Sequence, residues 1–427
     1  MQSRFDVVVV GASIAGSTAA VLYARAGLKV ALVERSTDAS AYKKVCTHYI
    51  QACGTPVLQR LGVTGAMEEA GAVRNSLRIH TRYGWSRTEL ADGADGPRHG
   101  YSIRREKLDP MLRALAGSEP NVDLLLGHSV RALVVGAEGR VVGAELAAKD
   151  RGTVRIEARL VVGADGRNSK VAELGGFKTE TLPHNRFGYM AYFKNLPLQS
   201  GNEAQFWIQE PDCAYAFPND DGLTLIACFV HKARLAEFKA DPEGSFRRLF
   251  AQFPESPVLS CGERVSDYFG MIDMPNLYRR PDGRGVTLVG DAALASDPMW
   301  GVGCGWALAS AEWLVDATVP ALQGKGDLQA GLVAYRKRHH RTLYPLHATN
   351  AAYSTGEPMD AGRRLLFSAT PYGRPLGSLV AQQLSLSVSN GGFLARAIPR
   401  ALWVHFKRAL GMSRPVLPET GTRTLAA

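Results

Sequence analysis

The sequence has no C-x-x-C pair, no low-complexity segment and no apolar run long enough to cross a membrane. Its six cysteines fall at irregular spacings, which excludes the usual zinc-binding patterns, so no metal site is expected. A chain of 427 residues builds a large apolar core without a disulfide framework, so we interpret most cysteines as free thiols of a reducing compartment. The N-terminus also lacks the layout of a signal peptide. These absences predict a cytoplasmic protein.

The charge is positive, but no motif of a nucleic-acid-binding protein accompanies it. Lysine and arginine number 50 against 40 aspartates and glutamates, a net charge of +10. The basic residues are spread along the chain without a zinc-finger, RRM or basic-region pattern. We interpret the surplus as a solubility charge that would also suit an anionic ligand, and we expect no nucleic-acid partner.

The N-terminal segment predicts a strand, a turn, a helix and a second strand. Residues 5–10 contain four successive valines, a β-branched run as in a strand buried on both faces of a parallel sheet. Residues 17–26 are rich in alanine and predict a helix that ends at Gly27, and residues 29–33 predict the second strand. This βαβ unit is typical of a dinucleotide-binding fold.

The turn between strand and helix carries glycines where such a fold needs them. Gly11 allows the tight turn, and Gly16 lets the helix pack closely on the strand, so the helix N-terminus faces a pyrophosphate. Ser13 replaces the middle glycine, so the backbone approaches the phosphates less freely. Glu34 ends the second strand, where a carboxylate accepts both hydroxyls of an adenosine ribose. The expected dinucleotide contacts in this segment are Gly11, Ser13, Ile14, Ala15, Gly16, Glu34 and Arg35.

Two more strand-and-turn motifs follow along the chain. Residues 160–163 are apolar and lead to Asp165-Gly166, and residues 288–289 lead to Gly290-Asp291. A glycine-rich loop, residues 301–305, and an alanine-rich helix then follow. The three motifs, in this order, resemble those of the FAD-dependent group A monooxygenases, the para-hydroxybenzoate hydroxylase superfamily. The resemblance covers about residues 1–345.

This resemblance implies FAD as the cofactor and NAD(P)H as its reductant. Asp291 would hydrogen-bond the ribitol of FAD. Gly303 and Cys304 would present backbone N–H groups to the pyrimidine edge of the flavin, where a helix N-terminus stabilises the negative charge of the reduced ring.

Three further residues take their roles from the same resemblance. Arg105 matches an R-x-x-L arginine near the FAD phosphates, Val130 matches a strand residue that contacts adenine, and Asp165 would orient the loops near the pyrophosphate. Taken alone, Arg105 would be a surface side chain and Asp165 an ordinary turn residue. The order of the motifs favours the functional interpretation.

The sequence departs from the monooxygenase pattern at two places. The loop after Gly290-Asp291 reads Gly303-Cys304-Gly305-Trp306 in place of the common Gly-x-Asn. Residues 43–48 and 215–218 look like the geranylgeranyl reductase and halogenase branches of the superfamily. The Trp-x-Trp-x-Ile-Pro signature of tryptophan halogenases is absent.

The fold expected is α/β, a Rossmann-type FAD-binding domain with an inserted, mainly antiparallel β substrate domain and a helical C-terminal segment. Short apolar pieces at residues 187–193, 204–208, 215–217 and 223–230 alternate with turns and predict the inserted sheet. The expected boundaries are residues 1–180 and 281–345 for the FAD-binding domain, 181–280 for the substrate domain and 346–427 for the C-terminal segment.

No Ser-His-Asp set or paired carboxylates are evident, as expected where the flavin carries the chemistry. His48 and Trp300 are weak catalytic candidates, and a structural role is favoured for His48. Candidates to line a substrate pocket, each of which is more often an ordinary core residue, are Tyr192, Trp207, Phe217, Met271 and Trp300.

The C-terminal segment carries an apolar series at i+4 spacing between basic residues. The series is Leu394, Ile398, Leu402, Phe406 and Leu410. A basic amphipathic helix of this kind can lie on a membrane surface. We favour the alternative, a helix that covers its own domain, and we expect Pro399 to interrupt it.

The resemblance ranks the functions. The first is a monooxygenase that uses NAD(P)H and O2 to hydroxylate or epoxidise a small hydrophobic aromatic, polyketide or terpenoid substrate. The second is a reductase of isoprenoid double bonds, which needs no O2, and the third is a halogenase. A non-enzymatic escort protein, as in Rab GDP-dissociation inhibitors, would keep the fold, but the intact Gly290-Asp291 motif argues against it.

Overall fold

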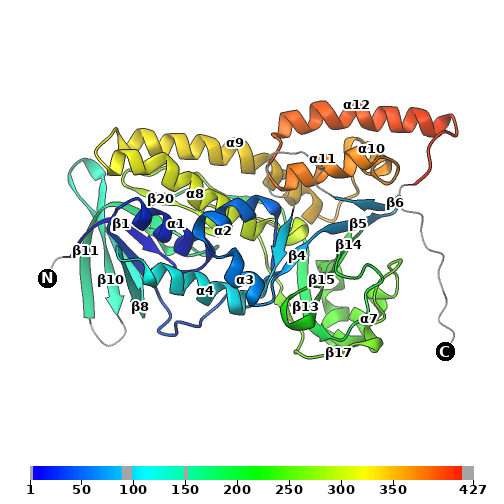
Figure 1. Ribbon diagram of the computed structural model, residues 1–427, viewed down its shortest axis with the longest axis horizontal. Helices are drawn as coiled ribbons and strands as arrows, with labels where there is room; N and C mark the ends of the chain where they lie inside the picture. Colours follow the sequence, from blue (N-terminus) through cyan, green and yellow to red (C-terminus); the bar gives the residue numbers. More distant parts are fainter. Residues whose placement is uncertain (1–2, 89–98, 149–151, 416–427) are drawn as a thin grey trace.

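The first sheet has seven strands in the part of the chain described by this computed structural model, residues 3–88, 99–148 and 152–415 (Figure 1). The strands are β1 Ser3–Val10, β2 Val30–Glu34, β8 Val122–Leu126, β9 His128–Val135, β10 Val141–Ala148, β11 Gly152–Gly163 and β20 Val286–Leu288. They follow the order β8-β2-β1-β11-β10-β9, and β20 pairs with the end of β11. Because β1 pairs in parallel with β2 and β11, the carboxyl ends of these strands lie at one edge.

Helices cover this sheet, and one of them, α1, has mainly small side chains. Helix α1 (Ile14–Arg25) packs against α8 (Gly303–Leu322) and α4 (Arg105–Ser118). Every residue of α1 from Ile14 to Ala24 is buried. The alanines and Gly16 of α1 make this close packing possible, as the sequence predicts.

The second sheet is mainly antiparallel, as predicted. Its strands are β5 Leu77–Thr81, β6 Gly84–Arg87, β13 Arg186–Lys194, β14 Ala204–Gln209, β15 Asp212–Pro218, β16 Leu223–His231, β17 Glu263–Arg264 and β18 Phe269–Met271. The order is β17-β13-β16-β15-β14-β5-β6, with β18 beside β13. Strands β5 and β6 come from residues 77–87, which the sequence pattern assigned to the first part of the FAD-binding domain. β5 joins β14 in parallel.

The two faces of this second sheet pack on different layers. Phe206 and Tyr215 stack with their ring centroids 4.6 Å apart on the face that meets the first sheet and its helices. Trp207 lies on the opposite face, under α6 (Leu235–Ala240) and α7 (Pro242–Phe250). Neighbouring residues of a strand point to opposite faces, so Phe206 and Trp207 are separated by the sheet itself.

Four helices complete the described chain: α9 Leu328–Ser354, α10 Ala361–Ala369, α11 Arg374–Leu384 and α12 Asn390–Ala409. The expected boundary at residue 345 lies inside α9, which continues through Pro345. Figure 1 shows α12 as the outermost layer over α10 and α11, at the end of the molecule away from β1. Among the described residues, no helix combines the length and the apolar character needed to span a membrane.

The expectation that Pro399 interrupts the last helix is wrong, because α12 continues through it. Proline removes one backbone N–H, which leaves the carbonyl of Ala395 without its helical donor. Both Ala395 and Pro399 are exposed, so water can satisfy that carbonyl.

The remaining elements are short. They are α2 Thr55–Leu61, α3 Thr64–Glu69, α5 Lys170–Leu174, β3 Tyr49–Ile50, β4 Val73–Asn75, β7 Gly100–Ser102, β12 Thr179–Leu182, β19 Asn276–Arg279 and β21 Leu294–Ala295. Strands β3, β7 and β4 form one small sheet, and β12, β19 and β21 form another.

Candidate functional site

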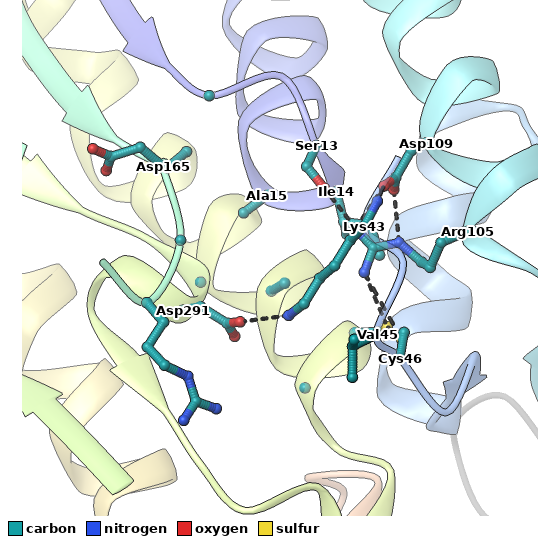
Figure 2. Close-up of a pocket in the computed structure, with 18 of the residues that line it drawn as sticks. Ser13, Ile14, Ala15, Lys43, Val45, Cys46, Arg105, Asp109, Asp165 and Asp291 are labelled. Carbon is teal, nitrogen blue, oxygen red and sulfur yellow. Dashed lines mark hydrogen bonds and ion pairs between the residues drawn. The ribbon is translucent and has the colours of Figure 1, made fainter. Parts of the chain in front are cut away.

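A cavity of about 1190 Å³ lies where β1 and β2 end, between the N-termini of α1 and α8. Figure 2 shows part of its wall. Every residue expected to bind a cofactor lines it except Gly16; these are Gly11, Ser13, Ile14, Ala15, Glu34, Arg35, Arg105, Val130, Asp165, Asp291, Gly303 and Cys304. Residues from seven separate parts of the sequence therefore meet at one site.

Gly11 and Gly16 have a backbone reason to be glycine. Gly11 has a φ of +104°, and a Cβ on it would lie 2.5 Å from the carbonyl oxygen of Ala164. A Cβ on Gly16 would lie 1.7 Å from the carbonyl oxygen of Gly11. Gly16 therefore sets the approach of helix to strand, while Gly11 forms the cavity wall itself.

Glu34 is fixed at the end of β2 by two backbone donors. The N–H groups of Ala12 and Ser36 each donate to its carboxylate at 3.0 Å. Because a carboxylate offers about four acceptor positions, lone pairs remain for two hydroxyl groups in the cavity. Arg35 and Val130 line the same end.

Arg105 connects α4 to the turn before α1. Its guanidinium donates to Ser13 Oγ at 2.6 Å and makes two bonds to the Asp109 carboxylate, at 2.7 and 2.9 Å. Burial alone would lower the pKa of Arg105, but Asp109 and the cysteines Cys304 and Cys46 raise it above its usual value. The hydroxyl at the middle-glycine position thus binds a permanently charged arginine next to the phosphate-binding turn.

Asp291 lies in the turn Gly290–Ala292 after β20, and Lys43 reaches it from the loop after β2 (Figure 2). The Lys43 ammonium and the Asp291 carboxylate are 2.8 Å apart. Burial raises the pKa of the Asp291 carboxyl, but the charge and hydrogen bond of Lys43, together with the charges of Arg167 and Arg105, lower it below its usual value. Asp291 therefore enters the cavity as a carboxylate.

The Asp165 carboxylate forms its hydrogen bonds with residues that follow it closely in sequence. Its carboxylate accepts hydrogen bonds from Ser169 Oγ at 2.5 Å and from the N–H groups of Lys170 and Val171 at 2.7 and 3.1 Å. These bonds hold the first turn of α5 and the cavity loop together. A positioning role for Asp165 agrees with this geometry.

The sequence analysis missed Lys43, Asp109 and Arg113, which complete the site. Asp109 also accepts the Lys43 N–H at 3.0 Å, and Arg113 donates to the carbonyls of Ala12, Ala39 and Ala41. Arg105, Asp109 and Arg113 follow one another at i+4 on α4. That charged series was the signal available in the sequence.

Residues 4–344 match the FAD binding domain family. The chain belongs to this family. It is an FAD-dependent oxidoreductase with the fold of flavin-dependent monooxygenases and halogenases. The cavity fits FAD, since it offers a carboxylate for a ribose, an arginine at the phosphate turn and two helix N-termini.

The curated relatives include two kinds of protein. Digeranylgeranylglycerophospholipid reductase 1 of Methanopyrus kandleri is 28% identical over 78% of this chain and 86% of its own length. Protein FixC of Salmonella typhi is 31% identical over 68% of this chain and 70% of its own length.

Solved structures share the fold at lower identity. The flavin-dependent brominase Bmp2 superposes with a TM-score of 0.74 at 18% identity, over 95% of this chain and 100% of its own. PqsL of Pseudomonas aeruginosa, a probable FAD-dependent monooxygenase, superposes with a TM-score of 0.69 at 21% identity, over 82% of this chain and 95% of its own.

The flavoprotein has two cysteine sulfurs close together at the flavin end of the cavity. Cys46 and Cys304, the second residue of α8, have their Sγ atoms 3.8 Å apart. A hydrogen bond with the Cys304 thiol, followed by the charges of Arg105 and Lys43, lowers the pKa of Cys46 although burial opposes this. The pKa of Cys304 is raised by Cys46 and by burial. Cys46 therefore carries the thiolate of the pair.

His48 lies behind the cavity wall. It is 1% exposed, has a φ of +59°, and accepts the Arg105 N–H at Nδ1 over 3.0 Å, while Nε2 contacts the Tyr192 hydroxyl. Burial lowers its pKa, so the ring is neutral. His48 holds the first residue of α4, which is the structural role favoured from the sequence.

Trp300 also lies behind the wall, packed edge-on against Phe206 and parallel to Phe367. Among the five residues proposed to line a substrate pocket, Met271 lies on the cavity. Phe217 and Trp300 lie in the core, and the partly buried Tyr192 packs against it. Trp207 lies on the far face of the sheet, where its indole donates to the Pro254 carbonyl at 2.9 Å.

Part of the cavity lining, mainly from the second sheet and from α9, is apolar. These apolar residues are Met190, Phe229, Met271, Met274, Leu294 and Leu343, and Asp273 and Asp297 line the cavity close to them in sequence. His339 borders it, and burial lowers the pKa of its imidazole to about 3, which keeps the ring uncharged.

Proposed function

We propose that this flavoprotein reduces carbon–carbon double bonds in an apolar, isoprenoid-type substrate, with FAD as cofactor and NAD(P)H as the source of electrons. The observation that carries the proposal is the methionine-, leucine- and phenylalanine-lined wall next to the loop that starts α8. Apolar side chains of this kind accommodate a hydrocarbon chain. The digeranylgeranylglycerophospholipid reductases among its relatives support this assignment.

Different residues would bind the cofactor and orient the substrate. Glu34, Arg105 and Asp291 would hold the ribose, the phosphates and the ribitol of FAD. The N–H groups of Gly303 and Cys304 would stabilise negative charge at the ring edge, because a helix N-terminus favours anions. When bound, FAD supplies the transfer of two electrons. The apolar wall would orient the double bond and exclude water.

A monooxygenase is the second candidate, because the same dry wall suits oxygen transfer. It would hydroxylate or epoxidise the hydrophobic substrate and would require O2 in addition to NAD(P)H. Both candidates share the flavin site and differ in one reactant.

One experiment separates them. Purified protein loaded with FAD is given NAD(P)H and a geranylgeranyl-bearing lipid, with and without O2, and the products are analysed by mass spectrometry. A reductase adds pairs of hydrogens under anaerobic conditions. Addition of an oxygen atom that requires O2 overturns the reductase and supports the monooxygenase. No conversion of polyprenyl lipids under either condition overturns the substrate class.

A further inference from the structure

Helix α12 has two apolar faces, and one of them lacks a partner among the described residues. Phe393, Ala397, Ala401 and Val404 are buried against the neighbouring helices α10 and α11. The predicted i+4 series lies on a different face and is exposed. This apolar stripe consists of Leu394, Ile398, Leu402, Trp403, Phe406 and Leu410, each 42–57% exposed.

The explanation favoured from the sequence, a helix that covers its own domain, accounts for one face of α12 and leaves the stripe unexplained. Helix α12 packs on its own domain through Phe393, Ala397, Ala401 and Val404, which the i+4 series does not include. Six large apolar side chains on one exposed helix face exceed the scattered apolar residues of an ordinary surface. Such a face marks an interaction site.

The charge around the stripe has one sign. Residues 361–415 contain eight arginines and lysines and no aspartate or glutamate. The rest of the chain therefore has 50 − 8 = 42 basic and 40 acidic residues, so the C-terminal helices carry most of the net charge of +10. Arg396, Arg400, Lys407 and Arg408 lie on α12 itself.

The aromatic and basic residues of α12 are arranged as at a lipid–water interface. The Trp403 and Phe406 rings stack with centroids 5.5 Å apart, and the Lys407 ammonium lies 5.2 Å from the Trp403 ring centre. Tryptophan occupies the headgroup level of bilayers, and lysine extends its charge from an apolar surface toward phosphates.

We propose that α12 docks the enzyme on an anionic lipid bilayer, with the apolar stripe in the headgroup region and the flanking cations on lipid phosphates. A second copy of the chain is a poorer occupant, because pairing two stripes would bring two basic faces together. The proposal goes beyond the reaction assigned above and does not depend on it.

The chain provides a specific probe of this contact. Of its six tryptophans, Trp403 is 55% exposed, while Trp85, Trp207, Trp300, Trp306 and Trp313 are at most 6% exposed. Brominated phospholipids quench only an indole that enters the bilayer. Vesicles of phosphatidylcholine and phosphatidylglycerol in equal parts should therefore quench Trp403 of the FAD-loaded protein, and Trp403→Phe should abolish the quenching but retain sedimentation with the vesicles.

Variants test each component of the contact. L402Q with F406Q should weaken vesicle binding roughly tenfold or more, because two apolar side chains no longer enter the bilayer. R396Q with R400Q should weaken binding to anionic vesicles and reduce its dependence on salt. Val135→Gln, at a 59% exposed site on β9, is the control and should bind as the wild type does. FAD content and melting temperature verify that each variant is folded.

Two outcomes would overturn the proposal. One is a folded wild type that fails to sediment with anionic vesicles. The other is a stable dimer in sedimentation velocity experiments that L402Q with F406Q converts to a monomer, since the stripe would then bind a second copy. Neither result bears on double-bond reduction measured with detergent-dispersed substrate.

Discussion

Lys43 and Asp291 form a 2.8 Å ion pair between the loop after β2 and the turn after β20, although 248 residues separate them in sequence. The pair places a cation beside the carboxylate expected to bind the ribitol of FAD. It also makes the ionisation of Asp291 depend on Lys43, since burial opposes the charged form.

Replacement of Lys43 by methionine should make FAD binding sensitive to mild acid. The pKa of Asp291 is lowered in the wild type, so its carboxylate stays charged as the pH falls. Without Lys43, burial raises that pKa and protonation begins at higher pH. When FAD affinity is measured at decreasing pH, it should begin to fall at a higher pH in Lys43→Met than in the wild type. Identical profiles would remove Lys43 from the site.

Asp291→Asn should lower flavin occupancy or displace the ring, because a charged acceptor becomes a neutral one. A lost charge-assisted hydrogen bond weakens binding roughly tenfold or more. Flavin content, melting temperature and the anaerobic rate of reduction by NAD(P)H are measured on one preparation. Glu243→Gln, which removes an exposed ion pair with Arg247 on α7, is the control. Full flavin content with a wild-type rate would show that Asp291 is only a turn residue.

Glu34→Ala should weaken FAD binding by roughly tenfold or more, because the ribose loses a carboxylate that Ala12 and Ser36 hold in place. Isothermal titration of the apoprotein with FAD measures the change. Asp123→Ala, at an exposed position on the neighbouring strand β8, should bind FAD normally. An unchanged affinity in folded Glu34→Ala would contradict the assignment.

Arg105→Gln should destabilise the apoprotein, because Asp109 is left buried without its cation. Removing one partner of a buried ion pair costs about 3–5 kcal/mol. The double variant Arg105→Gln with Asp109→Asn should recover much of this stability in urea unfolding, while its FAD affinity stays low. If Arg105→Gln and the double variant had the same free energy of unfolding, Arg105 and Asp109 would not be coupled.

The Cys46 thiol should react with iodoacetamide at a pH below the usual range of cysteine. The thiolate is the reactive form, and the Cys304 thiol contributes most to lowering the pKa of Cys46. The measurement is the rate of alkylation against pH in a Cys261→Ser background, which removes the exposed thiol. Cys304→Ala should shift the midpoint of this curve for Cys46 to higher pH. Cys53→Ala is the matched control, and an unshifted midpoint in Cys304→Ala would contradict the coupling.

The sequence predicts those parts of the site that the backbone dictates. The backbone requires glycine at Gly11, in the turn after β1, and at Gly16, in the first turn of α1; Glu34 and Asp291 follow strands at fixed places, so the spacing of these residues was informative. Trp207 and Trp300 could not be placed in this way. Whether an aromatic residue faces the cavity depends on strand register and on the layer behind it.

Two other features depend on contacts distant in sequence. The pairing of β5 with β14 joins segments separated by more than a hundred residues, and no local pattern encodes it. The continuity of α12 through Pro399 depends on which side of the helix the proline faces. An exposed proline leaves its carbonyl partner accessible to water.

The pairing of β5 with β14 has a consequence for engineering this enzyme. The chain leaves the first sheet for the second at residue 77, returns, enters it again at residue 186 and returns once more at β20. Neither sheet is a contiguous stretch of sequence, so neither can be excised, expressed alone or exchanged as a cassette. A graft of residues 181–280 from a relative would place a foreign β14 beside the native β5. Transplanting substrate preference therefore requires residues 77–87 of the donor as well.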